Sequence, residues 1–280
     1  MQNDTEIIFV KTGHDYQSYT DFFKLVELSG FQTVPLHEVD VSRYCVYIVA
    51  PHNGEWNPHI DNQNDKARNA HLVLWNIERP SGSKGSVGEY AKSNRELIYK
   101  RYIDDIWVSD RRLAKEIEMR FVVLGSHKGL GEPSSDKRYS FCHMSYEVGR
   151  RQTIYKYFPR SQIGPNSWPP ERDKVLKSCK FALNIHQDQH PFQEPLRFAL
   201  FAAYGLPIVS ETVLDAYPWG EETMVFSGYD SIVSKMRALI DQNYEQWESF
   251  GLRAREMMTE EFEFGKMVRK AIEESVFKWR

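Results

Sequence analysis

Eight short apolar segments recur along the chain. They are IIFV, YCVYIVA, HLVLW, DIWVS, RFVVLG, YSFCHM, FALNIH and PIVS, beginning at residues 7, 44, 71, 105, 120, 139, 181 and 207. Each is apolar almost throughout and does not alternate with polar residues, which is what a parallel sheet covered on both faces requires. The pattern therefore predicts an α/β fold.

Segments with helical periodicity lie between several of these predicted strands. The segment 16–29 carries apolar residues close to the helical period, and 86–101 and 110–118 also have helical patterns. The C-terminal segment 244–280 is helical in pattern almost without interruption. We therefore expect helices to connect the strands and to close the chain.

A domain boundary is expected near residues 115–120. RFVVLG has the pattern of the first strand of a new sheet, and GSHKGLG has that of the loop after it. The chain length of 280 residues suffices for two cores of ordinary size. The sequence thus predicts two similar α/β domains, residues 1–118 and 119–280.

Charge and composition narrow the classes of function. With 36 Lys and Arg against 39 Asp and Glu, no overall basic field attracts the protein to nucleic acid or anionic lipid, so a polyanion site has to be local. Apolar residues make up 41% of the chain, which excludes a disordered class. The aromatic share of 14% exceeds what core filling needs, and some rings are expected to line a cleft.

Cysteine usage and the N-terminus bear on location. Cys45, Cys142 and Cys179 lack the spacing of a zinc site or a disulfide framework, which favours a reducing, cytoplasmic setting. The segment MQNDTEIIFV lacks the features of a signal peptide, and no apolar stretch approaches the length of a membrane span. We expect a cytoplasmic protein with no membrane span.

The most informative stretch is FALNIHQDQHPFQEPLRFALFAAYGLPIVSE, residues 181–211. A strand ends in a polar loop, a proline after Glu194 opens a helix that ends at Gly205, and a second strand follows. A helix N-terminus at the carboxyl ends of parallel strands favours an anion, and Arg197 would add a guanidinium, so a phosphate site is expected. An ordinary βαβ unit is the alternative, which explains the periodicity but not the density of polar groups.

This stretch resembles the nucleotide-sugar-binding half of GT-B glycosyltransferases, in the "glycosyl transferases group 1" and spore-maturation-protein-like family. The matching positions in this half are Asn184, Ile185, His186, Arg197, Ala202, Gly205, Pro207, Ile208, Val209 and Ser210. Upstream, Gly149, Arg150 and Arg151 match the family's glycine and paired arginines at the start of a helix. The resemblance covers about residues 120–275 and extends more loosely to the N-terminal half.

The resemblance implies two Rossmann-like domains around a cleft, with the acceptor on the first and a UDP- or GDP-sugar donor on the second, and no obligatory metal. The donor-binding residues it implies are Lys128, Arg150, Arg151, Asn184, His186, Glu194, Arg197 and Ser210. A simple turn is the alternative for the Lys128 loop, and a solvated helix start for the arginine pair. Leu200 occupies the position of the family's ribose-binding glutamate, which leaves open a ribose contact from Glu194, a different donor or lost activity.

In the first half, candidate groups follow two predicted strands. Glu78, in the segment WNIERP, is the first candidate for the general base, and His14 or Asp15 is the second. Each could equally be a cap or turn residue. Trp56 and Trp75 are candidate acceptor platforms, although Trp75 could equally belong to the core.

Three hypotheses follow. The first is a glycosyltransferase that acts on a glycan, lipid-linked or small-molecule acceptor. The second is a glycosyltransferase that acts on modified DNA bases, which would need a local basic groove around Lys66, Arg68, Arg111 and Arg112. The third is a non-catalytic sugar-nucleotide-binding protein, which Leu200 favours. The choice between inversion and retention, the acceptor and the oligomeric state stay open.

Overall fold

A computed structural model describes residues 5–12, 19–50, 68–77, 95, 103–167, 169–187 and 192–276. The chain forms two compact units. The first comprises residues 1–124, 194–196 and 264–280, and the second comprises 125–193 and 197–263. Among the described residues, no helix is both long and apolar enough to cross a membrane.

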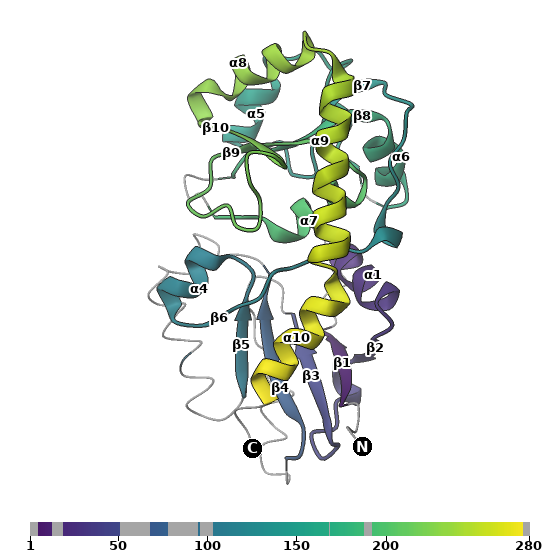
Figure 1. Cartoon of the computed structure of the whole chain (residues 1–280), viewed down its shortest axis with the longest axis vertical. Helices are drawn as coiled ribbons and strands as arrows, with labels where there is room; N and C mark the ends of the chain where they lie inside the picture. The colour runs from purple at the N-terminus through teal and green to yellow at the C-terminus, as the bar shows by residue number, and fades with distance from the viewer. Residues whose placement is uncertain are drawn as a thin grey trace. The chain divides into compact units, whose positions relative to one another are not determined.

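The first unit contains a parallel sheet with the strand order β2-β1-β3-β4-β5-β6 (Figure 1). Its strands are β1 (Glu6–Lys11), β2 (Gln32–Pro35), β3 (Cys45–Val49), β4 (His71–Asn76), β5 (Asp105–Val108) and β6 (Arg120–Phe121). Its described helices are α1 (Thr20–Leu28), the short 3-10 helix η2 (Leu36–Glu38), α4 (Arg111–Ile117) and α10 (Phe264–Val276). Every residue of β3 and β4 is buried, as their continuous apolar runs predict.

Aromatic side chains fill much of the core of the first unit. Phe264, at the start of α10, stacks on Trp75 of β4 with ring centroids 5.7 Å apart, and also contacts Phe9 and Phe22. Trp75 is fully buried and its indole N–H donates to Ser109 at 2.8 Å. The last helix therefore belongs to the core of the first unit, although it follows the second unit in the sequence.

The second unit contains a parallel sheet with the strand order β10-β9-β8-β7. Its strands are β7 (Tyr139–Cys142), β8 (Cys179–Asn184), β9 (Ile208–Glu211) and β10 (Met224–Ser227). Its helices are the 3-10 helix η5 (Lys128–Leu130), α5 (Arg150–Tyr155), α6 (Glu171–Lys177), α8 (Tyr229–Ile240), α9 (Tyr244–Glu256) and the π-helix η6 (Met257–Glu261), while α7 (Pro195–Ala203) belongs to this unit from Arg197 onward.

The turn from α7 into β9 depends on two glycines, one within the turn and one in α9, which packs against it. Gly205 has φ +63°, a left-handed conformation that ends the helix, as the sequence predicts. Gly251 of α9 packs directly on this turn, because a Cβ at residue 251 would lie 2.2 Å from the Gly205 carbonyl oxygen. A side chain at residue 251 would therefore displace this turn or α9.

Several elements differ from the sequence expectation. RFVVLG does not open the second sheet, because β6 pairs in parallel with β5 and closes the first. Two edge strands, β2 and β10, are not among the predicted ones. β2 (QTVP) begins with two polar residues, whereas β10 (MVFS) has three apolar residues, as the predicted PIVS does. The predicted helix 86–101 lies, apart from residue 95, outside the described residues. Local patterns indicate strands well but leave their pairing partners unspecified.

Candidate functional site

Polar side chains gather where β8 and β9 end in the second unit. Asn184 and Ser210, which face each other in the strand register, are both fully buried, and the Asn184 amide donates to Ser210 Oγ at 3.1 Å. Ser210 Oγ in turn donates to the Glu211 carbonyl at 2.8 Å. The carboxyl ends of parallel strands are where open α/β sheets bind ligands, so this edge is the candidate site.

Arg197 contacts this edge from α7. It is the third residue of that helix, and its Nη1 donates to Asn184 Oδ1 at 2.6 Å. The hydrogen bond orients the Asn184 amide so that its NH₂ group faces Ser210. The predicted donor-binding residues Asn184, Arg197 and Ser210 are therefore connected in one chain of hydrogen bonds.

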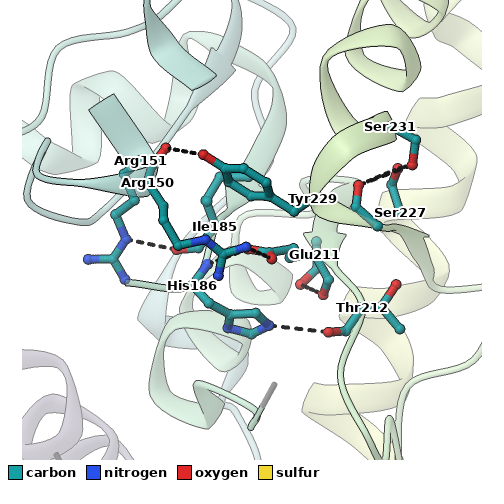
Figure 2. Close-up of polar contacts among 11 residues, drawn as sticks. Arg150, Arg151, Ile185, His186, Glu211, Thr212, Ser227, Tyr229 and Ser231 are labelled. Atoms are coloured by element: carbon teal, nitrogen blue, oxygen red, sulfur yellow. Dashed lines mark hydrogen bonds and ion pairs between the residues drawn. The ribbon is translucent and has the colours of Figure 1, made fainter. Parts of the chain in front are cut away.

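The arginine pair occupies the first two positions of α5, after Gly149 with φ +53°. Arg151 is 3% exposed, and its Nε donates to the carbonyl of Ile185 at 2.7 Å. Arg150 forms an ion pair with Glu211, and its guanidinium lies 4.0 Å from the centroid of the Tyr229 ring (Figure 2). Both arginines thus reach from α5 to the ends of the neighbouring strands.

His186 is held at the same edge by its backbone and its ring. Its N–H donates to Glu211 Oε2 at 2.9 Å, and its Nε2 lies 3.4 Å from the Thr212 carbonyl oxygen (Figure 2). That contact gives Nε2 the proton, because a carbonyl only accepts. The backbone that leaves β8 is thereby fixed to the end of β9.

His143 follows β7 directly and is fully buried. Its Nδ1 lies 3.2 Å from the Ser145 carbonyl oxygen, and its ring stacks on Tyr155 at 4.2 Å between centroids. Burial lowers the pKa of His143 to about 4, with Arg197 and Arg151 acting in the same direction and Glu147 opposing them. The imidazole is therefore neutral near pH 7, and this edge gains no positive charge from it.

The segment after β9 is fixed by a buried amide. Gln193 is 3% exposed, and its Nε2 donates to the carbonyls of Asp215 and Tyr217 at 2.6 and 2.8 Å. Tyr217 also packs edge-on against Phe262. The loop between β9 and β10 is thus held at two carbonyls before it reaches β10.

Lys128, Glu194 and Leu200 lie on other segments of the chain. Lys128 is exposed and forms an ion pair with Glu260 of η6 at 2.7 Å. Glu194 immediately precedes α7 and groups with the first unit. Leu200, at the position of the family glutamate, is buried in α7. The roles of Lys128 and Glu194 in donor binding stay predictions.

The candidate groups of the first half are mostly outside the described residues. Glu78, His14, Asp15 and Trp56 all lie there, so their catalytic and acceptor roles stay predictions. Trp75 is described and is a core residue, 0% exposed, so it presents no surface on which an acceptor could stack.

Three residues of this edge were not among the predicted ones. Glu211 follows the PIVS strand directly, and its position at a strand end is a signal that the sequence carried. Tyr229 follows β10, a strand that the apolar pattern does not predict. His143 lies within a segment interpreted as strand, whereas the strand ends one residue before it.

The arrangement is suited to an anionic ligand. Three guanidinium groups reach the ends of β8 and β9, and arginine matches phosphate oxygens with several donors at once. Among the residues that the structure describes, no group of three or more His, Cys, Asp or Glu could hold a metal ion.

Comparisons with known proteins identify the family. The sequence model described as glycosyl transferase-like matches residues 109–273, more than half of the chain. An uncharacterized protein of Acanthamoeba polyphaga mimivirus is 26% identical over 201 residues, which are 68% of this chain and 70% of that protein. The family model covers the whole candidate site of the second unit.

Solved structures show the same fold. Anabaena HepE in complex with UDP and glucose has a TM-score of 0.65 at 8% identity, covering 96% of this chain and 100% of its own. An alpha-glucosyltransferase in complex with UDP and a 13-mer DNA has a TM-score of 0.63 at 10% identity, covering 97% and 99%. TarM has a TM-score of 0.60 at 12% identity. The match covers 84% of this chain but only 55% of the TarM chain. The chain therefore belongs to the glycosyl transferase-like family and is a glycosyltransferase with the GT-B fold.

Proposed function

We propose that this protein transfers a sugar from a nucleoside-diphosphate sugar to an acceptor hydroxyl, and that it binds the diphosphate at the carboxyl ends of β8 and β9. The observation that carries the proposal is the convergence of Arg150, Arg151 and Arg197 on this edge. When the bond between the sugar and the diphosphate breaks, negative charge develops on the leaving phosphate. Guanidinium groups fixed nearby stabilise that charge.

The donor we propose is a UDP-sugar. HepE and the alpha-glucosyltransferase, which share the fold, were both solved with UDP. The acceptor hydroxyl needs a base, for which Glu78 is our first candidate and His14 or Asp15 the second. The arginines supply the positive charge for the leaving group, so we propose that a metal ion is not obligatory. The cysteine usage remains our reason for proposing a cytoplasmic setting.

A panel of nucleotide sugars tests this function. We expect release of UDP from one or more UDP-sugars when a suitable acceptor is present, measured by a coupled assay for nucleoside diphosphate. The variant Glu78→Gln should keep the UDP dissociation constant of the wild type and lose turnover by at least about a hundredfold. Absence of nucleoside diphosphate binding in the wild type would contradict the proposal at its first step.

DNA is a second candidate acceptor. The support is the fold shared with the alpha-glucosyltransferase solved with DNA and with a DNA-modifying beta-glucosyltransferase, at a TM-score of 0.55. Of the basic residues considered for a groove, Arg68 is ion-paired with Asp104 and its side chain is 18% exposed, while Arg112 pairs with Glu116. Adding duplexes with and without hydroxymethylated bases to the panel decides between the acceptors.

A non-catalytic sugar-nucleotide-binding protein is the third candidate. The buried Leu200 supplies no carboxylate for a ribose, so this candidate predicts nucleotide binding without turnover. The same panel separates it from the enzymes, because it would give a measurable UDP dissociation constant and no release from any donor with any acceptor.

A further inference from the structure

One carboxylate in the second unit contacts groups from two other strand-end segments. Glu211, the last residue of β9, forms an ion pair through Oε1 with Nη2 of Arg150 at the start of α5. Through Oε2 it accepts the N–H of His186, which follows β8, at 2.9 Å (Figure 2). The Glu211 side chain is 9% exposed. Each of its oxygens therefore has a partner inside the protein.

The Arg150 guanidinium is held from a second direction as well. The Tyr229 ring covers it at 4.0 Å, and the Tyr229 hydroxyl donates to the Arg150 carbonyl at 3.0 Å. Figure 2 shows the Tyr229 ring and the Glu211 carboxylate next to the Arg150 guanidinium. An arginine side chain loses rotamer entropy when a ligand fixes it, so holding it in advance removes a cost that ligand binding would otherwise incur.

We propose that Glu211 is a positioning residue of the donor site: it fixes the Arg150 guanidinium and the His186 backbone before the nucleoside diphosphate binds. The proposal rests on the function proposed above. A carboxylate near a diphosphate repels it, so any benefit of Glu211 to binding has to come through the groups that it holds. Positioning and simple repulsion therefore predict opposite effects when the charge is removed.

The UDP dissociation constant of Glu211→Gln, measured by calorimetry on the full chain, distinguishes positioning from repulsion. The glutamine keeps an oxygen that can accept the His186 N–H but loses the ion pair with Arg150. We expect binding about tenfold weaker than in the wild type. The control Asp136→Asn, which neutralises an exposed carboxylate paired with Arg138, should leave the constant unchanged. Unchanged or tighter binding in Glu211→Gln would overturn the proposal.

A double-mutant cycle assigns the effect to Arg150. In an Arg150→Ala background, Glu211→Gln should change the UDP dissociation constant by less than about twofold, because the group that it positions is gone. A full tenfold loss in that background would show that Glu211 acts on binding without Arg150, contrary to the proposal.

Hydrogen exchange tests the positioning without any nucleotide. We expect Glu211→Ala to raise deuterium uptake in the peptides that contain residues 146–151 and 184–187, with uptake in β1 and β3 unchanged. If Glu211→Ala does not fold, Glu211→Gln gives the same comparison for residues 146–151. Wild-type uptake in both peptides overturns the proposal. If the wild type binds no UDP, the proposed function fails, while the exchange result still decides whether Glu211 holds the two segments.

Discussion

Each unit of the protein contains a cluster of charged side chains with little exposure. The cluster of the first unit lies at the amino end of a strand, and that of the second unit lies at the carboxyl ends of the strands. In the first unit, Asp104 and Asp105 pair with Arg68 and Arg120 where β5 begins, and Asp104 Oδ2 also accepts the Leu72 N–H at 2.7 Å. In the second unit, the arginines reach the carboxyl ends of the strands. In the first cluster two guanidinium groups pair with Asp104, Asp105 and the more exposed Glu274, whereas the second has three guanidinium groups and the carboxylate of Glu211.

This difference separates a structural ion cluster from the proposed ligand site. Burial lowers the pKa of His71 in the first cluster, as it does that of His143 in the second, so a perturbed histidine does not distinguish them. The two clusters differ in the end of the sheet at which they lie and in their net charge. The first cluster lies at the amino end and has no excess of positive charge, whereas a cationic cluster at the carboxyl end suits an anion.

The largest expected effect is on stability in the first cluster. Asp104→Ala should lower the free energy of unfolding by about 3 to 5 kcal/mol, because it leaves Arg68 without the carboxylate that holds it at low exposure. Urea unfolding measures this change. The UDP dissociation constant of the folded variant should stay within about twofold of the wild-type value. A variant that folds but no longer binds UDP would indicate that the first cluster belongs to the donor site.

Arg197→Ala should have the opposite signature. We expect UDP binding about a hundredfold weaker, since the variant removes a fixed guanidinium from the diphosphate site and leaves the Asn184 amide without its partner. The free energy of unfolding should fall by about 1 to 3 kcal/mol, less than in Asp104→Ala, because the buried Oδ1 of Asn184 loses its donor. Arg138→Ala, which removes an exposed arginine of the same unit, is the control. Wild-type affinity in Arg197→Ala would contradict our location of the diphosphate.

The pH dependence of stability comes third. His143 has a pKa of about 4 in the folded chain, below the ordinary value of 6.5 for an unfolded histidine. As the pH falls from about 6.5 to 4, the unfolded state takes up a proton that the folded state does not, so His143 should cost up to about 3 kcal/mol of stability. His143→Gln should flatten this part of the curve, measured by urea unfolding at several pH values. An unchanged slope would contradict the buried, neutral assignment.

The smallest expected effect is that of removing divalent cations. If the arginines of the second cluster supply the charge for the leaving phosphate, EDTA should change the rate of UDP release by less than about twofold. A rate that falls in EDTA and recovers on addition of Mg²⁺ or Mn²⁺ would show that the arginine cluster acts together with a metal.

Much of the fold and part of the site follow from local sequence. Continuous apolar runs indicate β3, β4 and β8 because both faces of those strands are buried. The family resemblance implies Asn184, Arg197 and Ser210 as donor-binding residues, and the structure joins the three in one chain of hydrogen bonds. Of these, Arg197 also has a local signal, because it lies in the first turn of a helix after a strand. The edge strand β2 (QTVP) lacks the apolar signal and has no buried residue, whereas β10 (MVFS) carries an apolar run that was not interpreted as a strand.

The sequence by itself determined the α/β class, the strands of both sheets other than β2 and β10, and the family resemblance, because these depend on periodicity and on residues close together in the chain. Tertiary structure alone decided that β6 completes the first sheet, that α10 returns to the first unit and that Trp75 is a core residue. It also brought Glu211 to Arg150 across 61 residues. Pairings over such separations depend on how strands and helices pack, and no local pattern specifies them.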